Sequence, residues 1–287
     1  RPPSRKQRAV VKERQRLAMV KAKADNRWRP YYDIEGPKVR LGVLWFFAVI
    51  IGIAAGVPSA TLIMVLACAA ASAHTLRTWR ASGFDADPMT ALVGTGLVVG
   101  AAIFGAPAMG IMLVLVTLGG IALSVQSVAG SLAGAKGENA VDVGPVLART
   151  GLWMQCVLPP SVAGGSLVLL TEVEPFAALA LVVIVSAYDC GDFLIGSGAT
   201  NVIEGPVAGA VAVVVTTLAI ASFELLPFET FGAIVFGSLV ALLAPAGQYL
   251  ATAMLPHSRS FAPALRRIDS LLLAAPLWYF GLDRILL

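Results

Sequence analysis

Long apolar runs alternate with short polar segments along most of the chain. A transmembrane helix takes about 20 apolar residues, and a helix satisfies its own backbone hydrogen bonds inside a bilayer. The pattern therefore predicts an all-α, polytopic integral membrane protein with about nine transmembrane helices. The apolar runs cover residues 39–57, 60–76, 89–104, 108–132, 143–170, 175–196, 202–223, 227–255 and 267–287.

Composition supports this interpretation and divides the chain in two. Of the 287 residues, 57% are hydrophobic and 13% are charged, which is less charge than soluble domains carry. The first 40 residues hold 13 of the 21 Lys and Arg residues. Such a tail favours anionic lipid at a cytoplasmic membrane face, and we expect no nucleic acid partner. The predicted domains are a basic cytoplasmic tail, residues 1–38, and a transmembrane domain, residues 39–287.

The remaining charges predict an orientation. With the N-terminus in the cytoplasm, nine crossings place most basic loop residues inside, as the positive-inside rule requires. We predict a multi-pass protein of the inner (plasma) membrane whose active side is cytoplasmic. The basic residues of the inside loops are Arg77, Arg80, Lys136, Arg149, Arg259, Arg266 and Arg267. The same orientation brings four polar residues to the cytoplasmic side, namely Asp189, Asp192, Gln248 and Asp269.

Two aspartates stand at the end of the sixth apolar run. The stretch from Ser186 to Gly198 reads S-A-Y-D-C-G-D-F-L-I-G-S-G, and Asp189 and Asp192 share one face of a helix. A carboxylate inside a span costs roughly 2.5–3.5 kcal/mol on insertion scales, and two neighbouring carboxylates favour a cation between them. We therefore predict a cation site that faces a polar cavity. The alternative is that the helix ends at Asp189 and water solvates both acids.

Further polar residues open the seventh and ninth runs. Glu204 begins the seventh run, and Arg266 and Arg267 stand beside Asp269 where the ninth begins. An arginine pair suits bidentate phosphate binding, although two basic residues at a cytoplasmic helix end are also what membrane topology requires. The cysteines have no metal-ligand spacing, and we expect all of them to be small core residues. They are Cys68, Cys156 and Cys190.

Together these motifs resemble the phosphatidate cytidylyltransferase family, the CDP-diacylglycerol synthases. Residues 189–196, D-C-G-D-F-L-I-G, look like the family's S-D-x-G-A-Y segment with its following apolar residues and glycine. Glu204-Gly205 looks like the end of the S-P-K-K-T-W-E-G segment, and Gly247-Gln248 looks like a later G-D pair. Residues 267–271, R-I-D-S-L, look like the final D-R-x-D-S segment. Residues 73–80, A-H-T-L-R-T-W-R, are similar to the family's loop after the second span.

The resemblance implies an enzyme that transfers CMP from CTP to phosphatidate, or to a related anionic lipid, and releases pyrophosphate. It implies that Asp189 and Asp269 are catalytic and that both, with Asp192, bind Mg²⁺, with a monovalent cation as a candidate second ion. It leaves a homodimer open. The substrate-binding residues that it implies are Arg266, Arg267, Gln248 and Glu204.

The chain also departs from the family's pattern. The S-P-K-K-T stretch and the basic K-R and G-H-G-G segments are missing, Gln248 stands where the family has a metal-binding Asp, and Arg266 replaces the first Asp of D-R-x-D. Each change removes ligands or charge from a site that must hold a triphosphate and divalent cations. Two alternatives therefore remain: a non-catalytic relative that acts as a lipid-binding scaffold or regulator, and a small transporter whose intramembrane acids couple ions.

Overall fold

The structure is a computed structural model, and it describes residues 38–84, 87–133, 143–199, 201–223, 228, 230–258 and 260–286. These residues form helices, and no strand occurs among them. The predicted all-α class is confirmed for this part of the chain. The basic tail lies outside the described residues, except for Lys38 at the start of the first helix.

Each of the first eight predicted runs corresponds to one α-helix of the described residues, and the ninth is divided between two. The α-helices are α2 (Lys38–Ala54), α3 (Val57–Ala81), α4 (Pro88–Ala101), α5 (Ala106–Ala133), α6 (Val143–Val173), α7 (Pro175–Gly196), α8 (Glu204–Ala221), α9 (Thr230–Ala253), α10 (Leu265–Ile268) and α11 (Leu271–Leu286), and a short 3₁₀ helix, η1 (Ala102–Phe104), continues α4.

Six of these helices are long and apolar enough to cross a membrane, namely α3, α5, α6, α7, α8 and α9. The segments Gly42–Ala54 and Pro88–Phe104 are also apolar but shorter. The protein is therefore a multi-pass membrane protein by the length and composition of its helices. The count of nine crossings and the cytoplasmic position of the N-terminus stay predictions.

Helix ends follow ordinary capping chemistry. Asp87 and Glu174 each accept a hydrogen bond from the backbone N–H two residues further on, and each is followed by the proline that opens α4 or α7. A side-chain acceptor before a proline at the first helical position is a common helix start. Gly56, between α2 and α3, and Gly105, between η1 and α5, have φ values of 104° and 90°, a region where glycine is favoured.

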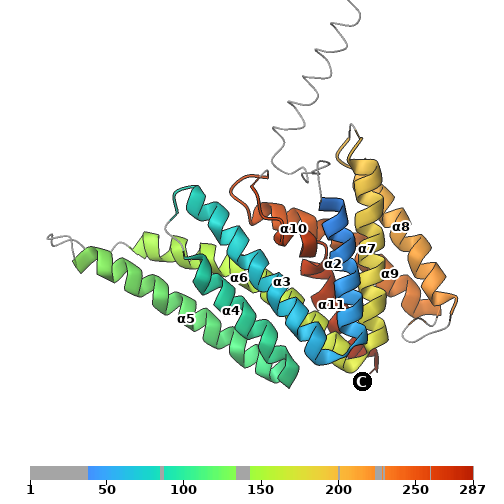
Figure 1. The fold of residues 1–287 in the computed structure, drawn as a ribbon, viewed down its shortest axis with the longest axis horizontal. Helices are drawn as coiled ribbons and strands as arrows, with labels where there is room; N and C mark the ends of the chain where they lie inside the picture. Colours follow the sequence, from blue (N-terminus) through green and yellow to red (C-terminus); the bar gives the residue numbers. More distant parts are fainter. Residues whose placement is uncertain are drawn as a thin grey trace, which may run out of the picture.

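The helices are arranged so that α5 lies at one edge of the molecule, while α2, α7, α8, α9 and α11 lie together at the other side (Figure 1). Helix α5 packs against α4, η1 and α6. Many of its apolar side chains are exposed, which suits contact with lipid chains. Examples are Ile111, Val114, Leu115 and Leu118.

Close contact between α7 and α8 positions the polar end of α7. A Cβ atom on Gly209 would lie 2.6 Å from the Tyr188 ring, and one on Gly191 would lie 2.7 Å from the backbone oxygen of Ala208. These two glycines allow the helix axes to approach, as small residues do between membrane helices.

The ninth apolar run is divided. The sequence predicted one helix from residue 267, but α10 ends at Ile268 and α11 begins at Leu271. In the turn between them, the Asp269 side chain accepts a hydrogen bond from the Ser270 backbone N–H. Aspartate favours such local bonds over regular helix, and the turn brings both residues into the interior.

The cysteine prediction is wrong at one position. Cys68 and Cys156 are buried, as expected, but Cys190 is exposed. The reason is its place on α7, one residue after Asp189: its side chain projects from a different face of the helix than the buried Asp192. The apolar character of the surrounding run did not distinguish these faces.

Candidate functional site

Polar side chains from three separate parts of the chain meet in one cluster. Asp189 and Asp192 come from α7, Gln248 comes from α9, and Asp269 and Ser270 form the turn between α10 and α11. We call these five residues the acidic cluster. In Figure 1, α10 lies at the upper edge of the molecule, beside the start of α2.

Ser270 connects two of the acids. Its hydroxyl group donates a hydrogen bond to Asp189 Oδ1, and its backbone N–H donates to Asp269 Oδ1 at 2.9 Å. One residue therefore contacts both carboxyl groups, although Asp189 and Ser270 are 81 positions apart in the sequence. The structure brings Asp189 and Asp269 together, as the sequence analysis expected.

The Gln248 amide lies among the acids. Its Nε2 atom donates to Asp192 Oδ2 at 3.3 Å, to Asp189 Oδ1 at 3.5 Å and to Ser270 Oγ at 3.4 Å. A neutral donor that contacts two carboxylates offsets part of the cost of placing them side by side. The prediction that Gln248 belongs to the site is consistent with this position.

Helix α7 continues well beyond Asp189, to Gly196. The two aspartates therefore lie inside a helix, and the alternative that the helix ends at Asp189 is wrong. Asp192 and Ser270 are each only 1% exposed, and Gln248 and Asp269 are each 7% exposed. Asp189 is partly exposed as a residue, whereas the other four members of the cluster are buried.

Gly247 permits the close contact between α9 and the α10–α11 turn. A Cβ atom at this position would collide with the backbone oxygen of Asp269. Because the opposing atom belongs to the backbone, the turn could not remain in place beside a larger residue. The glycine thus brings Asp269 and Ser270 next to Gln248.

Two arginines lie beside the acids. Arg266 Nη1 is 3.6 Å from Asp269 Oδ2 and donates to Thr252 Oγ1 at 2.9 Å. Arg267 interacts electrostatically with Asp189 and Asp269. Both arginines are partly exposed, so a phosphate group from outside could approach them.

Burial affects the charge of Asp269, which lies in the turn outside the six long helices. Removal from water raises the pKa of Asp269 above its ordinary value, and the positive charge of Arg266 opposes that rise. The Arg266 ion pair thus favours the ionised carboxylate in a largely buried position.

Neither the known protein-family models nor the curated proteins give a match to this chain. The resemblance described above therefore rests on the motif residues themselves. What the geometry adds is that hydrogen bonds join residues from three of these motifs, namely Asp189, Asp192, Gln248, Asp269 and Ser270.

Metal binding stays a prediction. Among the described residues, no group of three or more His, Cys, Asp or Glu side chains is arranged to hold a metal ion. The predicted ligands Asp189, Asp192 and Asp269 belong instead to a cluster that also contains Gln248 and Ser270. Carboxylate, amide and hydroxyl oxygens are nevertheless the donor types that Mg²⁺ prefers.

Glu204 occupies a different position from the other predicted residues. It is exposed at the first position of α8, and its Oε1 atom accepts a hydrogen bond from the Asn201 backbone N–H at 3.3 Å. This contact stabilises the start of the helix. Its predicted substrate-binding role receives no support from the hydrogen bonds of the described residues.

The sequence analysis assigned no role to Ser270, Thr252 or Gly247. Ser270 directly follows an aspartate where a run of polar residues becomes apolar, a pattern typical of a helix start. That signal could have suggested a turn at this point. Thr252 and Gly247 carry no such signal, because their roles depend on which element packs against α9.

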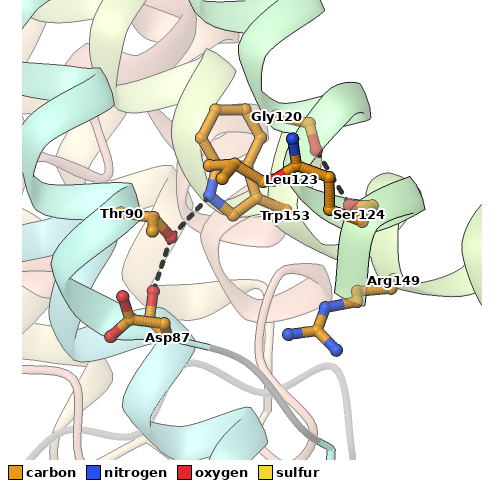
Figure 2. Close-up of a pocket in the computed structure, with 8 residues that line it drawn as sticks. Asp87, Thr90, Gly120, Leu123, Ser124, Arg149 and Trp153 are labelled. Carbon is orange, nitrogen blue, oxygen red and sulfur yellow. Dashed lines mark hydrogen bonds between the residues drawn. The ribbon is translucent and has the colours of Figure 1, made fainter. Parts of the chain in front are cut away.

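A separate cavity of about 380 Å³ lies between α4, α5 and α6, and contains none of the predicted site residues. Trp153 Nε1 donates to Thr90 Oγ1 at 3.1 Å, and Thr90 Oγ1 donates to the backbone oxygen of Asp87 (Figure 2). Trp153, Thr90 and Asp87 thus form a chain of hydrogen bonds, which indicates a structural role for these bonds. Arg149 lines the same cavity.

Proposed function

We propose that this protein is a membrane-embedded phosphatidate cytidylyltransferase, which transfers CMP from CTP to phosphatidate and forms CDP-diacylglycerol and pyrophosphate. The observation that carries this proposal is the Ser270 bridge between Asp189 and Asp269. It joins two motifs that resemble separate parts of that family's signature. Arg266 and Arg267 lie beside the same acids and suit phosphate groups.

The reaction needs charge neutralisation and positioning more than proton transfer. A phosphate oxygen of phosphatidate, already ionised, forms a bond to the α-phosphorus of CTP, and the bond from that phosphorus to the bridging oxygen of pyrophosphate breaks. Negative charge gathers on the phosphates, so fixed positive groups favour the transition state. Arg266 and Arg267 would bind and orient these phosphates.

A divalent cation fits the donor types of the cluster. Asp189 and Asp269 would hold Mg²⁺, with Asp192 and Gln248 beside them, and a monovalent cation is a candidate second ion. Bound Mg²⁺ supplies charge neutralisation at the phosphates. Asp189 is the acid of the cluster whose residue is partly exposed, and its Oδ1 atom is already bonded to Ser270 and Gln248.

The proposed topology has nine crossings, a cytoplasmic N-terminus and a cytoplasmic active side in the plasma membrane. It is supported by the basic residues at the end of α3 and in α10, Arg80, Arg266 and Arg267. An excess of Lys and Arg marks cytoplasmic ends of membrane helices. CTP is a cytoplasmic metabolite, so the site and the nucleotide would then be on the same side.

The test uses the purified full chain in detergent with labelled CTP, phosphatidate and Mg²⁺, and it measures labelled CDP-diacylglycerol. We expect Asp189→Asn to abolish product formation, because it removes a carboxylate that the proposed cation would need. Glu172→Gln is the matched control. Glu172 is an exposed acid near the end of α6, a helix that contributes no residue to the acidic cluster. Unchanged turnover in Asp189→Asn would remove Asp189 from the mechanism.

A non-catalytic, lipid-binding relative is the second candidate. The observation that favours it is the position of Gln248, whose amide already donates to both Asp189 and Asp192, so these acids have a partner without a cation. Binding of phosphatidate by the wild-type protein, with no CDP-diacylglycerol formed at any Mg²⁺ concentration, would favour this candidate over the enzyme.

A further inference from the structure

The guanidinium group of Arg267 lies next to α2 as well as to the acidic cluster. A Cβ atom on Gly42, in α2, would be 2.6 Å from Arg267 Nη1, 3.4 Å from Cζ and 3.8 Å from Nη2. Real Cβ atoms do not approach other heavy atoms as closely as the first distance, because such a contact is repulsive. The guanidinium group thus occupies the space in which the Cβ atom of any other residue at position 42 would lie.

Backbone conformation does not require glycine at this position. The described glycines with positive φ are Gly56, Gly83 and Gly105, and Gly42 lies inside α2. Alanine is a better helix former than glycine, so helical geometry alone would favour alanine here. The absence of a side chain at Gly42 therefore makes room for the guanidinium group of Arg267.

The identity of that neighbour separates Gly42 from Gly247. All three atoms nearest to its virtual Cβ belong to the guanidinium group of Arg267, whereas at Gly247 the nearest atom is a backbone oxygen. A backbone atom moves only with its whole element, but the end of an arginine side chain moves by rotation about its own bonds. A methyl group at position 42 would displace the guanidinium group and leave α2 and α10 in place.

We propose that Gly42 is a positioning residue, which keeps Arg267 beside Asp189 and Asp269 in the place where it binds a phosphate group. The identity of that phosphate, in phosphatidate or in CTP, rests on the proposed function. Arg267 would make the contact with the ligand, and Gly42 would act only through Arg267.

A double-mutant cycle on the full chain in detergent tests this inference. The variants are Gly42→Ala, Arg267→Ala and the two combined, with Gly96→Ala as the matched control. Gly96 is a helical glycine whose Cβ would meet Val65 at an ordinary 3.7 Å. Binding of dioctanoyl phosphatidate and of CTP is titrated separately, with dioctanoyl phosphatidylcholine as the reference lipid, and the thermal unfolding temperature is measured for each variant.

We expect Gly42→Ala to unfold at or above the wild-type temperature and yet to bind phosphatidate, CTP or both about tenfold more weakly, as loss of one hydrogen bond to a charged group predicts. In the Arg267→Ala background the same change should have no further effect, because the residues act as one unit. Gly96→Ala should bind like the wild type.

Wild-type affinity of Gly42→Ala for both ligands would overturn the inference, and so would additive losses in the double variant. The inference would also be overturned if the wild-type protein bound phosphatidate no more tightly than phosphatidylcholine and did not bind CTP. A wild-type protein that binds these ligands but makes no CDP-diacylglycerol would overturn only the proposed reaction, and the cycle would still decide the role of Gly42.

Discussion

Replacing Gln248 with glutamate tests whether the acidic cluster can bind a cation. The two side chains have the same length, so a carboxylate oxygen would replace Nε2, which lies 3.3 Å from Asp192 Oδ2 and 3.5 Å from Asp189 Oδ1. A hydrogen bond to a charged group is worth about 1.5–3 kcal/mol. Because both distances are long, the lower value applies, and losing the two bonds should cost about 3 kcal/mol.

Repulsion among the four carboxyl groups of the altered cluster adds to that loss, and a divalent cation should reverse much of it. The measurement is the thermal unfolding temperature in detergent, with EDTA and with Mg²⁺. We expect Gln248→Glu to unfold at a clearly lower temperature than the wild type in EDTA and to recover with Mg²⁺, because an ion that binds only the folded state stabilises it.

Gln155→Glu is the matched control for this experiment. The Gln155 amide also donates between helices, but its acceptor is the backbone oxygen of Ala253, at 3.0 Å. Its replacement should lower stability equally with and without Mg²⁺. If Gln248→Glu unfolded at the wild-type temperature in EDTA, or if Mg²⁺ left it unchanged, the cation-binding capacity of the cluster would be refuted.

Three other changes have distinct expected results. Gly247→Ala should lower both the unfolding temperature and CDP-diacylglycerol formation, because its methyl group would collide with the backbone of Asp269; wild-type values for both would contradict the contact. Trp79→Phe should lower the free energy of unfolding by about 1 kcal/mol in denaturant titrations in detergent and leave turnover unchanged. The reason is that Trp79 Nε1 donates a hydrogen bond at 2.8 Å to the backbone oxygen of Met254, just after α9. A loss of turnover at full stability would argue against this structural role. Arg266→Gln should lower the unfolding temperature more than Arg80→Gln, because Arg266 is paired with a buried carboxylate and Arg80 is exposed; equal shifts would argue against the ion pair.

Much of the fold could be predicted because membrane helices carry a strong sequence signal. The predicted limits of the sixth run, 175–196, are those of α7, since a capping glutamate and proline mark its start and polar residues follow its end. The break between α10 and α11 was missed. It depends on one local bond between a side chain and the backbone at Asp269, which an apolar run of normal length does not indicate.

For the candidate site, the sequence predicted only that its residues lie at the same side of the membrane. Topology alone placed Asp189 and Asp269 at the same side, but it could not assign Ser270 as the residue that contacts both. Gly42 and Gly247 look like any other small residues in apolar helices. Their roles become visible only when the atoms opposite them are known, because close contact between distant elements leaves no periodic pattern in the sequence.

The uneven burial of the cysteines has a practical consequence. Cys68 and Cys156 are enclosed, and Cys190 is exposed directly beside Asp189. The unaltered chain therefore offers one accessible thiol for a fluorescent or nitroxide label, without any engineered cysteine. A label at that position would report, by its spectrum and mobility, whether nucleotide or lipid changes the surroundings of α7.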